Sequence, residues 1–113
     1  MPKPNSIHLA LSDVPPGTLH ACTVAGREIL VCRTKDGIHA LDNICTHAYA
    51  RLNEGRLRGT RLICPLHGAS FDVRDGRVLG PPATRPLTVH EVSVIEDRIE
   101  ISIAPTDPVT LSL

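Results

Sequence analysis

Apolar and polar residues alternate along the last quarter of the chain. Ile99, Ile101 and Ile103 are separated by polar residues, which is the period-two pattern of a strand buried on one face. A two-residue turn at Glu96-Asp97 would place Val94 opposite Ile99 on the preceding segment. The pattern therefore predicts an antiparallel hairpin whose apolar side chains share one face.

The alternation of the strand before this hairpin loses its phase. Val89 and Val92 are three positions apart, whereas residues on one face of a strand are separated by even numbers. One extra residue near His90-Glu91, a β-bulge, would restore the phase. The sequence therefore predicts a bulged strand at this point.

Short strand-like segments separated by turn residues fill most of the remaining chain. Gly, Asp and Pro recur between them, and no stretch keeps a helical period. Many short strands with frequent turns are typical of a barrel or sandwich of antiparallel sheets. We therefore expect an all-β fold and, at this length, a single domain over residues 1–113. The further segments expected as strands are Leu19–Val24, Ile29–Thr34, Ile38–Leu41, Arg61–Cys64, Ser70–Val73 and Arg77–Leu79.

Composition and charge narrow the classes of function. The 12 basic and 12 acidic residues give a formal net charge of zero, without a long run of either sign. Such a balance provides no attraction for nucleic acid or for an anionic membrane. The N-terminal segment lacks the apolar stretch of a secretory signal, and no segment approaches transmembrane length. We therefore expect a cytoplasmic protein that binds neither nucleic acid nor membrane.

Two short segments combine a cysteine with a histidine. Cys45-Thr46-His47 and Cys64-Pro65-Leu66-His67 each offer one thiolate and one imidazole within a single turn of chain. Cysteines in a cytoplasmic chain are more often metal ligands or core residues than disulfides. Because the chain has only one Tyr, one Phe and no Trp, a metal centre that crosslinks two loops would help it hold together. We predict such a centre between the loops at about 43–50 and 64–70.

The order of the ligands distinguishes two kinds of metal centre. A mononuclear zinc site usually groups like ligands, Cys with Cys and His with His, as in a zinc-stapled interaction domain. Here each segment pairs one Cys with one His, which suits a [2Fe–2S] cluster whose irons take the two thiolates and the two imidazoles respectively. We therefore favour one iron–sulfur cluster over zinc. Its predicted ligands are Cys45, His47, Cys64 and His67.

The chain over about residues 43 to 87 resembles the Rieske ferredoxins that serve bacterial aromatic-ring-hydroxylating dioxygenases, through the run CTHAYARLNEGRLRGTRLICPLHGASFDVRDGRVLGPPATRPL. The resemblance implies stacked antiparallel sheets, three in number, with the cluster between two loops at one tip. It implies that Cys45 and Cys64 bind the buried iron, and that His47 and His67 bind the outer iron. It also implies that the segment at Pro81-Pro82 covers the cluster.

Departures from a related pattern indicate the type of cluster. Respiratory Rieske proteins add a disulfide between the two loops and place Ser and Tyr hydroxyls against the cluster sulfurs. This chain has Ala50 and Leu66 at the disulfide positions, and Ala69 and Phe71 at the hydroxyl positions. Hydrogen bonds to cluster sulfur stabilise the reduced state and raise the potential. We therefore expect an unbraced cluster with a potential of roughly −150 mV rather than about +300 mV.

The resemblance implies an electron carrier without a catalytic site of its own. It would take one electron from a flavin-containing NAD(P)H-dependent ferredoxin reductase and pass it to a terminal oxygenase. An oxygenase would itself need a second iron site, and after Leu87 only His90 remains as a candidate ligand. The alternative is a small subunit of another oxidoreductase, such as a nitrite-reductase-like complex. Many of those subunits have lost the four ligands that this chain keeps.

The two remaining cysteines are expected to be structural. A regular hairpin turning at Ala25-Gly26 would put Cys22 and Cys32 on opposite faces of their sheet. Residues on opposite faces cannot form a disulfide with each other without a large backbone movement. We therefore predict two buried apolar thiols at these positions.

Overall fold

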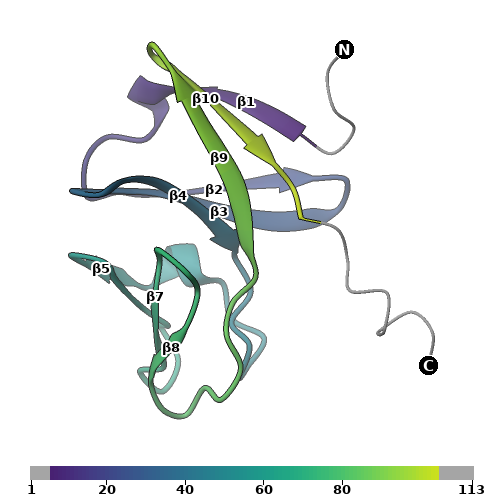
Figure 1. Cartoon of the computed structure of the whole chain (residues 1–113). Helices are drawn as coiled ribbons and strands as arrows, with labels where there is room; N and C mark the ends of the chain where they lie inside the picture. The colour runs from purple at the N-terminus through teal and green to yellow at the C-terminus, as the bar shows by residue number, and fades with distance from the viewer. Residues whose placement is uncertain (1–5, 105–113) are drawn as a thin grey trace.

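The computed structural model describes residues 6–104, which form β-strands and two short 3-10 helices (Figure 1). In chain order the elements are β1 (Ser6–Ala10), η1 (Leu11–Asp13), β2 (Leu19–Val24), β3 (Arg27–Thr34), β4 (Gly37–Asp42), η2 (Leu52–Glu54), β5 (Arg56–Arg58), β6 (Arg61–Ile63), β7 (Ser70–Asp72), β8 (Val78–Gly80), β9 (Val89–Ile95) and β10 (Arg98–Ser102). The all-β prediction is confirmed, and each segment expected as a strand overlaps one.

Neither end of the chain belongs to the described part. The first residues of the N-terminal segment, and both ends of the expected 1–113 domain, lie outside residues 6–104. Within that range, no helix is long and apolar enough to cross a membrane.

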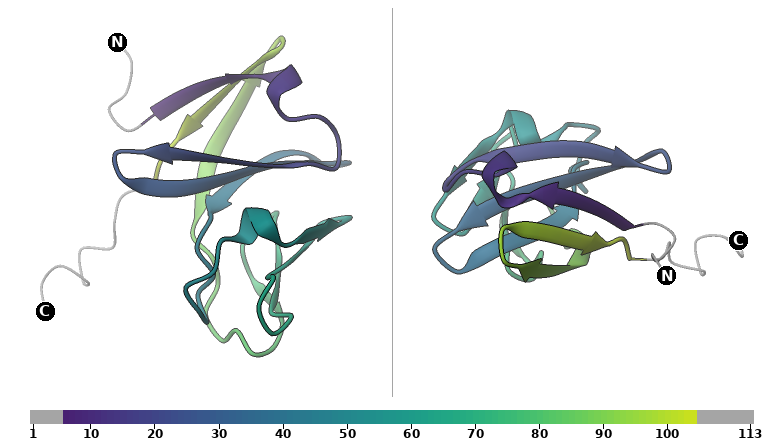
Figure 2. Two further views of the ribbon diagram at one scale, coloured as in Figure 1. Left: turned by 180° about the vertical axis from the view of Figure 1, so that it is seen from behind. Right: turned by 90° about the horizontal axis from the view of Figure 1, so that it is seen from above.

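The strands form one six-stranded and one four-stranded antiparallel sheet. The larger sheet has the order β1-β10-β9-β4-β3-β2, and its two halves are joined where β9 pairs with β4 at His90 and Val89. The smaller sheet has the order β5-β6-β7-β8. In Figures 1 and 2 the two halves and the smaller sheet lie as three successive tiers. The stacked antiparallel sheets implied by the resemblance are therefore present.

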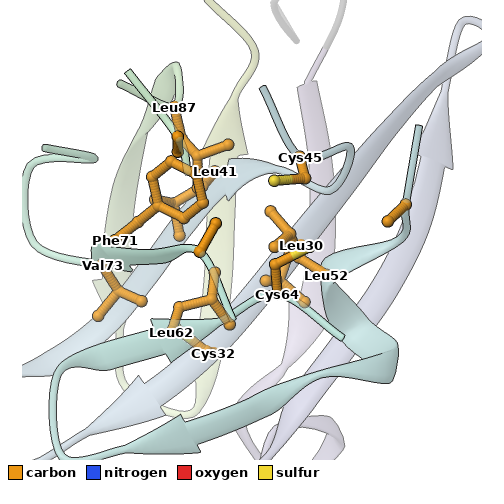
Figure 3. Packing of buried hydrophobic residues seen from close by; sticks show 13 residues of the cluster. Leu30, Cys32, Leu41, Cys45, Leu52, Leu62, Cys64, Phe71, Val73 and Leu87 are labelled. Atoms are coloured by element: carbon orange, nitrogen blue, oxygen red, sulfur yellow. The ribbon is translucent and has the colours of Figure 1, made fainter. Parts of the chain in front are cut away.

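Strand β3 is buried on both faces and separates two hydrophobic cores. Its run from Ile29 to Cys32 is wholly buried, and successive side chains of a strand point to opposite faces. On one face lies what we call the hairpin-side core, made of Val14, Ile29, Val31, Ala40, Ile99 and Ile101. On the other lies the ligand-side core, made of Leu30, Cys32, Leu41, Cys45, Ala50, Leu52, Leu62, Cys64, Ala69, Phe71, Val73, Ala83 and Leu87 (Figure 3).

The bulge predicted near His90-Glu91 is wrong. Strand β9 continues without a register shift from its pairing with β4 to its pairing with β10. The phase is kept because His90 takes the inward position, where its side chain is 0% exposed. Its Nδ1 accepts a hydrogen bond from the backbone N–H of Ala104 at 2.9 Å, so Nε2 donates to Asp42 Oδ1 at 2.9 Å. A histidine with both nitrogens bonded therefore replaces an apolar residue in this strand.

The prediction of two buried thiols is confirmed for Cys32, whereas Cys22 is only partly buried. Cys32 lies in the ligand-side core, whereas Cys22 packs against the hairpin-side core. Both thiols are free. Burial raises the pKa of the Cys32 thiol to about 12, because the thiolate is disfavoured in apolar surroundings.

Candidate metal centre

The first ligand loop follows the end of β4 and is closed by its own backbone. The N–H of Cys45 donates to the carbonyl of Ala50 at 2.9 Å, and an isolated β-bridge joins Ile44 to Arg51. Cys45 is only 5% exposed, whereas His47 is half-buried. The loop therefore directs its cysteine into the ligand-side core and carries its histidine closer to the surface.

The second ligand loop repeats this construction at the end of β6. The N–H of Cys64 donates to the carbonyl of Ala69 at 2.7 Å, again five residues along the chain. His67 and Gly68 have φ values of 62° and 74°, which gives the tight reversal that the loop needs. Cys64 is 2% exposed and His67 is exposed. Both loops thus bury the thiol and present the imidazole outward.

Asn43 anchors the first loop, although the sequence analysis did not single it out. This fully buried side chain accepts from the N–H of Asn53 at 2.9 Å and donates to Asn53 Oδ1 at 2.8 Å. The backbone carbonyl of Asn43 accepts a hydrogen bond from the N–H of Leu52 at 2.7 Å. The only sequence signal is a polar residue at the end of a strand, beside a candidate ligand. Such a position does not reveal that its partner lies ten residues away.

Three of the four predicted ligands form one group of donor atoms. Cys45 Sγ, a ring nitrogen of His47 and Cys64 Sγ all lie within 4.8 Å of one another, and Cys45 Sγ is 2.8 Å from His47 Nδ1. His67 lies outside this group: its Nδ1 is 3.3 Å from His47 Nε2, and the two rings meet edge to face with centroids 5.5 Å apart. The structure therefore brings the four side chains to one end of the molecule, with His67 on the outer side.

The two cysteines lie at the edge of the ligand-side core (Figure 3). Burial raises the pKa of the Cys64 thiol to about 11, while the N–H of Leu66, 3.5 Å from its sulfur, acts in the opposite direction. A thiol in this setting becomes a thiolate when a metal supplies compensating positive charge. Two buried sulfurs with two outward imidazoles fit the mixed donor set of the predicted cluster.

The segment after β8 lies against the first ligand loop. Thr46 Oγ1 donates to the carbonyl of Arg85 at 2.7 Å, and Arg85 Nη2 donates to the carbonyl of Thr46 at 3.3 Å. Ala83 is buried in the ligand-side core. The residues that follow Pro81-Pro82 therefore form a strap, held at Arg85, against the first ligand loop. The reciprocal Thr46–Arg85 contact was not foreseen, since 39 residues separate the two positions.

The positions that set this chain apart from respiratory Rieske proteins surround the cysteines. Ala69 and Phe71 are fully buried and carry no hydroxyl group, and Ala50 and Leu66 carry no thiol. The nearby Ser70 hydroxyl accepts from Arg61 Nη1 at 2.8 Å instead. The interior beside the two cysteines is therefore apolar at positions 69 and 71, with no hydroxyl donor at either.

Comparison with known proteins identifies the family. The Rieske [2Fe-2S] domain matches residues 7–95 of the chain. The chain belongs to the Rieske [2Fe–2S] domain family. The predicted [2Fe–2S] cofactor is therefore confirmed over zinc, and the Cys45, His47 and Cys64 group is the place in the described residues where it fits.

Similar proteins at 30% identity or more are named as ferredoxin components of dioxygenase systems, which are electron carriers and not catalytic enzymes. This Rieske protein is 36% identical over 96 residues to the ferredoxin component of the naphthalene 1,2-dioxygenase system of Pseudomonas aeruginosa, covering 85% of this chain and 92% of that one. The ferredoxin of carbazole 1,9a-dioxygenase from Nocardioides aromaticivorans has a TM-score of 0.82 at 32% identity, with 87% and 97% of the two chains covered.

Another solved structure is a complex of reduced oxygenase and oxidised ferredoxin in carbazole 1,9a-dioxygenase. One of its chains has a TM-score of 0.83 to the Rieske protein at 35% identity, with 88% of this chain and 94% of that chain covered. A protein described as a nitrite reductase small subunit has a TM-score of 0.72 but only 19% identity. That second likeness concerns the fold alone.

Proposed function

We propose that this Rieske protein carries single electrons from a flavin-containing NAD(P)H-dependent ferredoxin reductase to the terminal oxygenase of an aromatic-ring-hydroxylating dioxygenase, in the cytoplasm. The observation that carries the proposal is the graded burial of the site. Its cysteines are nearly inaccessible, while its histidines lie at the surface of the same end of the molecule. The naphthalene and carbazole dioxygenase ferredoxins support it, as does the complex of a similar ferredoxin with its oxygenase.

We assign four ligands to the cluster. Cys45 and Cys64 would hold the inner iron, and His47 and His67 the outer one, which supplies one-electron redox chemistry when bound. The closed backbone of both loops keeps the ligands in place, and the ligand-side core keeps water from the sulfurs. His67, the most accessible of the four, is the side chain that a partner would approach. Because both hydrophobic cores share β3, we also take the whole chain as one domain.

We further propose a potential near the lower end of the Rieske range, roughly −150 mV. The support is the apolar, hydroxyl-free lining at Ala69 and Phe71. Phe71→Tyr would bring a hydroxyl into this lining and should raise the potential. A redox titration followed by visible absorption would measure both values, and a wild-type potential near +300 mV would contradict the proposal.

The ligand assignment is tested by composition, spectroscopy and substitution. The purified protein should contain two irons and two sulfides, and on reduction should give a rhombic EPR signal with an average g value below that of all-cysteine clusters. A colourless protein with stoichiometric zinc would refute the assignment. His67→Cys should lower the potential, because a thiolate adds negative charge that opposes reduction. His8→Cys, at an exposed position of β1, is the matched control and should leave the potential unchanged.

Measurements of electron flux test whether this protein acts between a reductase and an oxygenase. NAD(P)H oxidation and hydroxylated product would be measured with combinations of a flavoprotein reductase and an aromatic-ring oxygenase encoded near the gene for this chain. With one reductase–oxygenase pair, we expect hydroxylated product to form only when the Rieske protein is present. A cluster-loaded protein that supports no pair would favour the subunit of another oxidoreductase instead.

A further inference from the structure

The β5–β6 hairpin carries arginines on its outward face. In β5 the side chain of Leu57 packs against the ligand-side core, so Arg56 and Arg58 point to the other face and are exposed. Across the two-residue turn, Arg58 is the direct partner of Arg61 in β6. Two arginines therefore face each other across one antiparallel pair, an arrangement in which like charges destabilise the sheet.

No carboxylate of the described chain compensates these charges. Neither Arg56 nor Arg58 has an ion-pair or hydrogen-bonding partner for its side chain within residues 6–104, and Arg61 donates to the uncharged Ser70 hydroxyl. The acid opposite Arg61 in β7 is Asp72. Its carboxylate is already held by Arg74 at 2.7 Å and by Arg77 at 3.4 Å. We call the surface formed by Arg56, Arg58 and Arg61 the arginine face.

Further positive charge lies beside the turn of this hairpin. A groove there is lined by Arg33, near the end of β3, and Lys35, in the β3–β4 turn, together with Leu57 and Gly59. The side chains of Arg33 and Lys35 form no ion pair in the described chain either. The one acid between them and β4, Asp36, is paired with Arg74 at 3.6 Å. A molecule of zero net charge thus concentrates unpaired cations around one hairpin.

One arginine of this face lies on the strand that leads into a predicted cluster ligand. Arg61 begins β6, which leads directly into Cys64, three residues or roughly 10 Å farther along an extended strand. Arg56 pairs with Ile63, the residue before Cys64. A partner seated on this face would therefore lie beside the end of the molecule that carries the ligand loops.

We propose that the arginine face is a docking surface for a carboxylate-rich surface on a protein electron-transfer partner. The planar guanidinium group binds carboxylates through two parallel hydrogen bonds, which lysine cannot do. An uncompensated patch of one sign attracts an oppositely charged protein and speeds its association, especially at low salt. Because the net charge is zero and no aromatic side chain lies among these arginines, a protein surface suits them better than nucleic acid. The inference rests on the proposed electron-carrier function.

The first test uses a defined acidic probe. Binding of fluorescein-labelled deca-glutamate to the cluster-loaded protein would be followed by fluorescence anisotropy between about 20 and 150 mM salt. The wild type should bind at low salt, and the Arg56→Gln/Arg58→Gln variant should bind about tenfold more weakly. Arg98→Gln, which removes an exposed arginine of β10, is the matched control and should change the affinity less than about twofold. Unchanged binding by the double variant would overturn the proposal, as would tighter binding of a DNA duplex of equal charge.

The second test separates this proposal from the proposed function. With the reductase and oxygenase that support flux, the second-order rate constants for reduction and reoxidation would be measured by stopped flow. At least one of them should fall with added salt, and Arg58→Glu should lower it about tenfold while leaving the EPR spectrum unchanged. Salt-independent rates that Arg58→Glu leaves intact would overturn the docking surface. If no partner exchanges electrons with the wild type, the proposed function fails, and the peptide titration still decides whether the arginine face binds carboxylates.

Discussion

Leu62→Ala should destabilise the protein and disturb its metal centre, whereas Ile101→Ala should only destabilise it. Leu62 lies in the ligand-side core, two residues before Cys64 and on the same face of β6. Ile101 lies in the hairpin-side core, on the other side of β3. Comparing the two variants therefore separates the effect of a cavity on the stability of the whole protein from its local effect on the ligands.

The expected loss of stability follows from burial. Both side chains are 0% exposed, and each substitution removes three buried carbon atoms. At about 0.8 kcal/mol for each carbon, the transfer contribution is about 2.4 kcal/mol. The cavity that remains adds to this value, so the free energy of unfolding should fall by about 3–4 kcal/mol in either variant. Val94→Ala, at a side chain that is 47% exposed, should cost less than about 1 kcal/mol.

Two measurements on the cluster-loaded proteins check this reasoning. Urea unfolding followed by far-UV circular dichroism gives the loss of stability, and release of iron to a chelator under native conditions reports local opening around the ligands. Leu62→Ala should release iron at least about tenfold faster than Ile101→Ala, since 1.4 kcal/mol of local destabilisation is enough for a factor of about ten. Equal rates of iron release in two equally destabilised variants would show that the two cores do not act separately.

Two further predictions concern individual polar contacts. Hydrogen bonds from Arg74 lower the pKa of Asp72 to about 2, so the carboxylate stabilises the fold above pH 4 or so and loses this effect as the pH falls toward 2. At pH 7, Asp72→Asn should therefore lower the free energy of unfolding by about 1–2 kcal/mol. This value takes into account that solvent screens the half-exposed arginines. An unchanged urea midpoint would contradict the prediction. Thr46→Val removes the hydroxyl that donates to the Arg85 carbonyl and should accelerate iron release about fivefold, as expected for about 1 kcal/mol. Thr23→Val, at an exposed position of β2, is its control, and equal rates in the two variants would show that the strap does not hold the ligand loop.

Several features of the fold follow from local sequence patterns. The alternation at Ile99 and Ile101 predicts both the strand and its buried face, because a strand places every second residue on one side. The continuous apolar run from Ile29 to Cys32 belongs to a strand with a core on each face. Strands β1 and β5 escaped prediction. Strand β5 lies at the edge of the smaller sheet, and its only strand partner there is β6, so it becomes a strand through that pairing.

Contacts between distant segments could not be derived in the same way. If histidine is counted as a polar residue, the alternation predicts that His90 faces outward. In the fold His90 faces inward, where Asp42 and the backbone of Ala104 satisfy both of its ring nitrogens. Asn43 and the Thr46–Arg85 pair also act through partners that a reading of neighbouring residues does not connect. Each of these contacts depends on which strands become neighbours, and tertiary packing decides that.

The ligand set shows both contributions at one site. Cys45, His47, Cys64 and His67 were predicted as ligands from sequence alone, because the chemistry of a cluster requires those residue types and each short loop supplies one thiol and one imidazole. Only the tertiary structure decided that the thiols are buried and the imidazoles accessible. It did so because the two loops, closed by matching hydrogen bonds, meet at the edge of one core. Side-chain identity determines which metal can bind, and packing determines which side of the site a partner can reach.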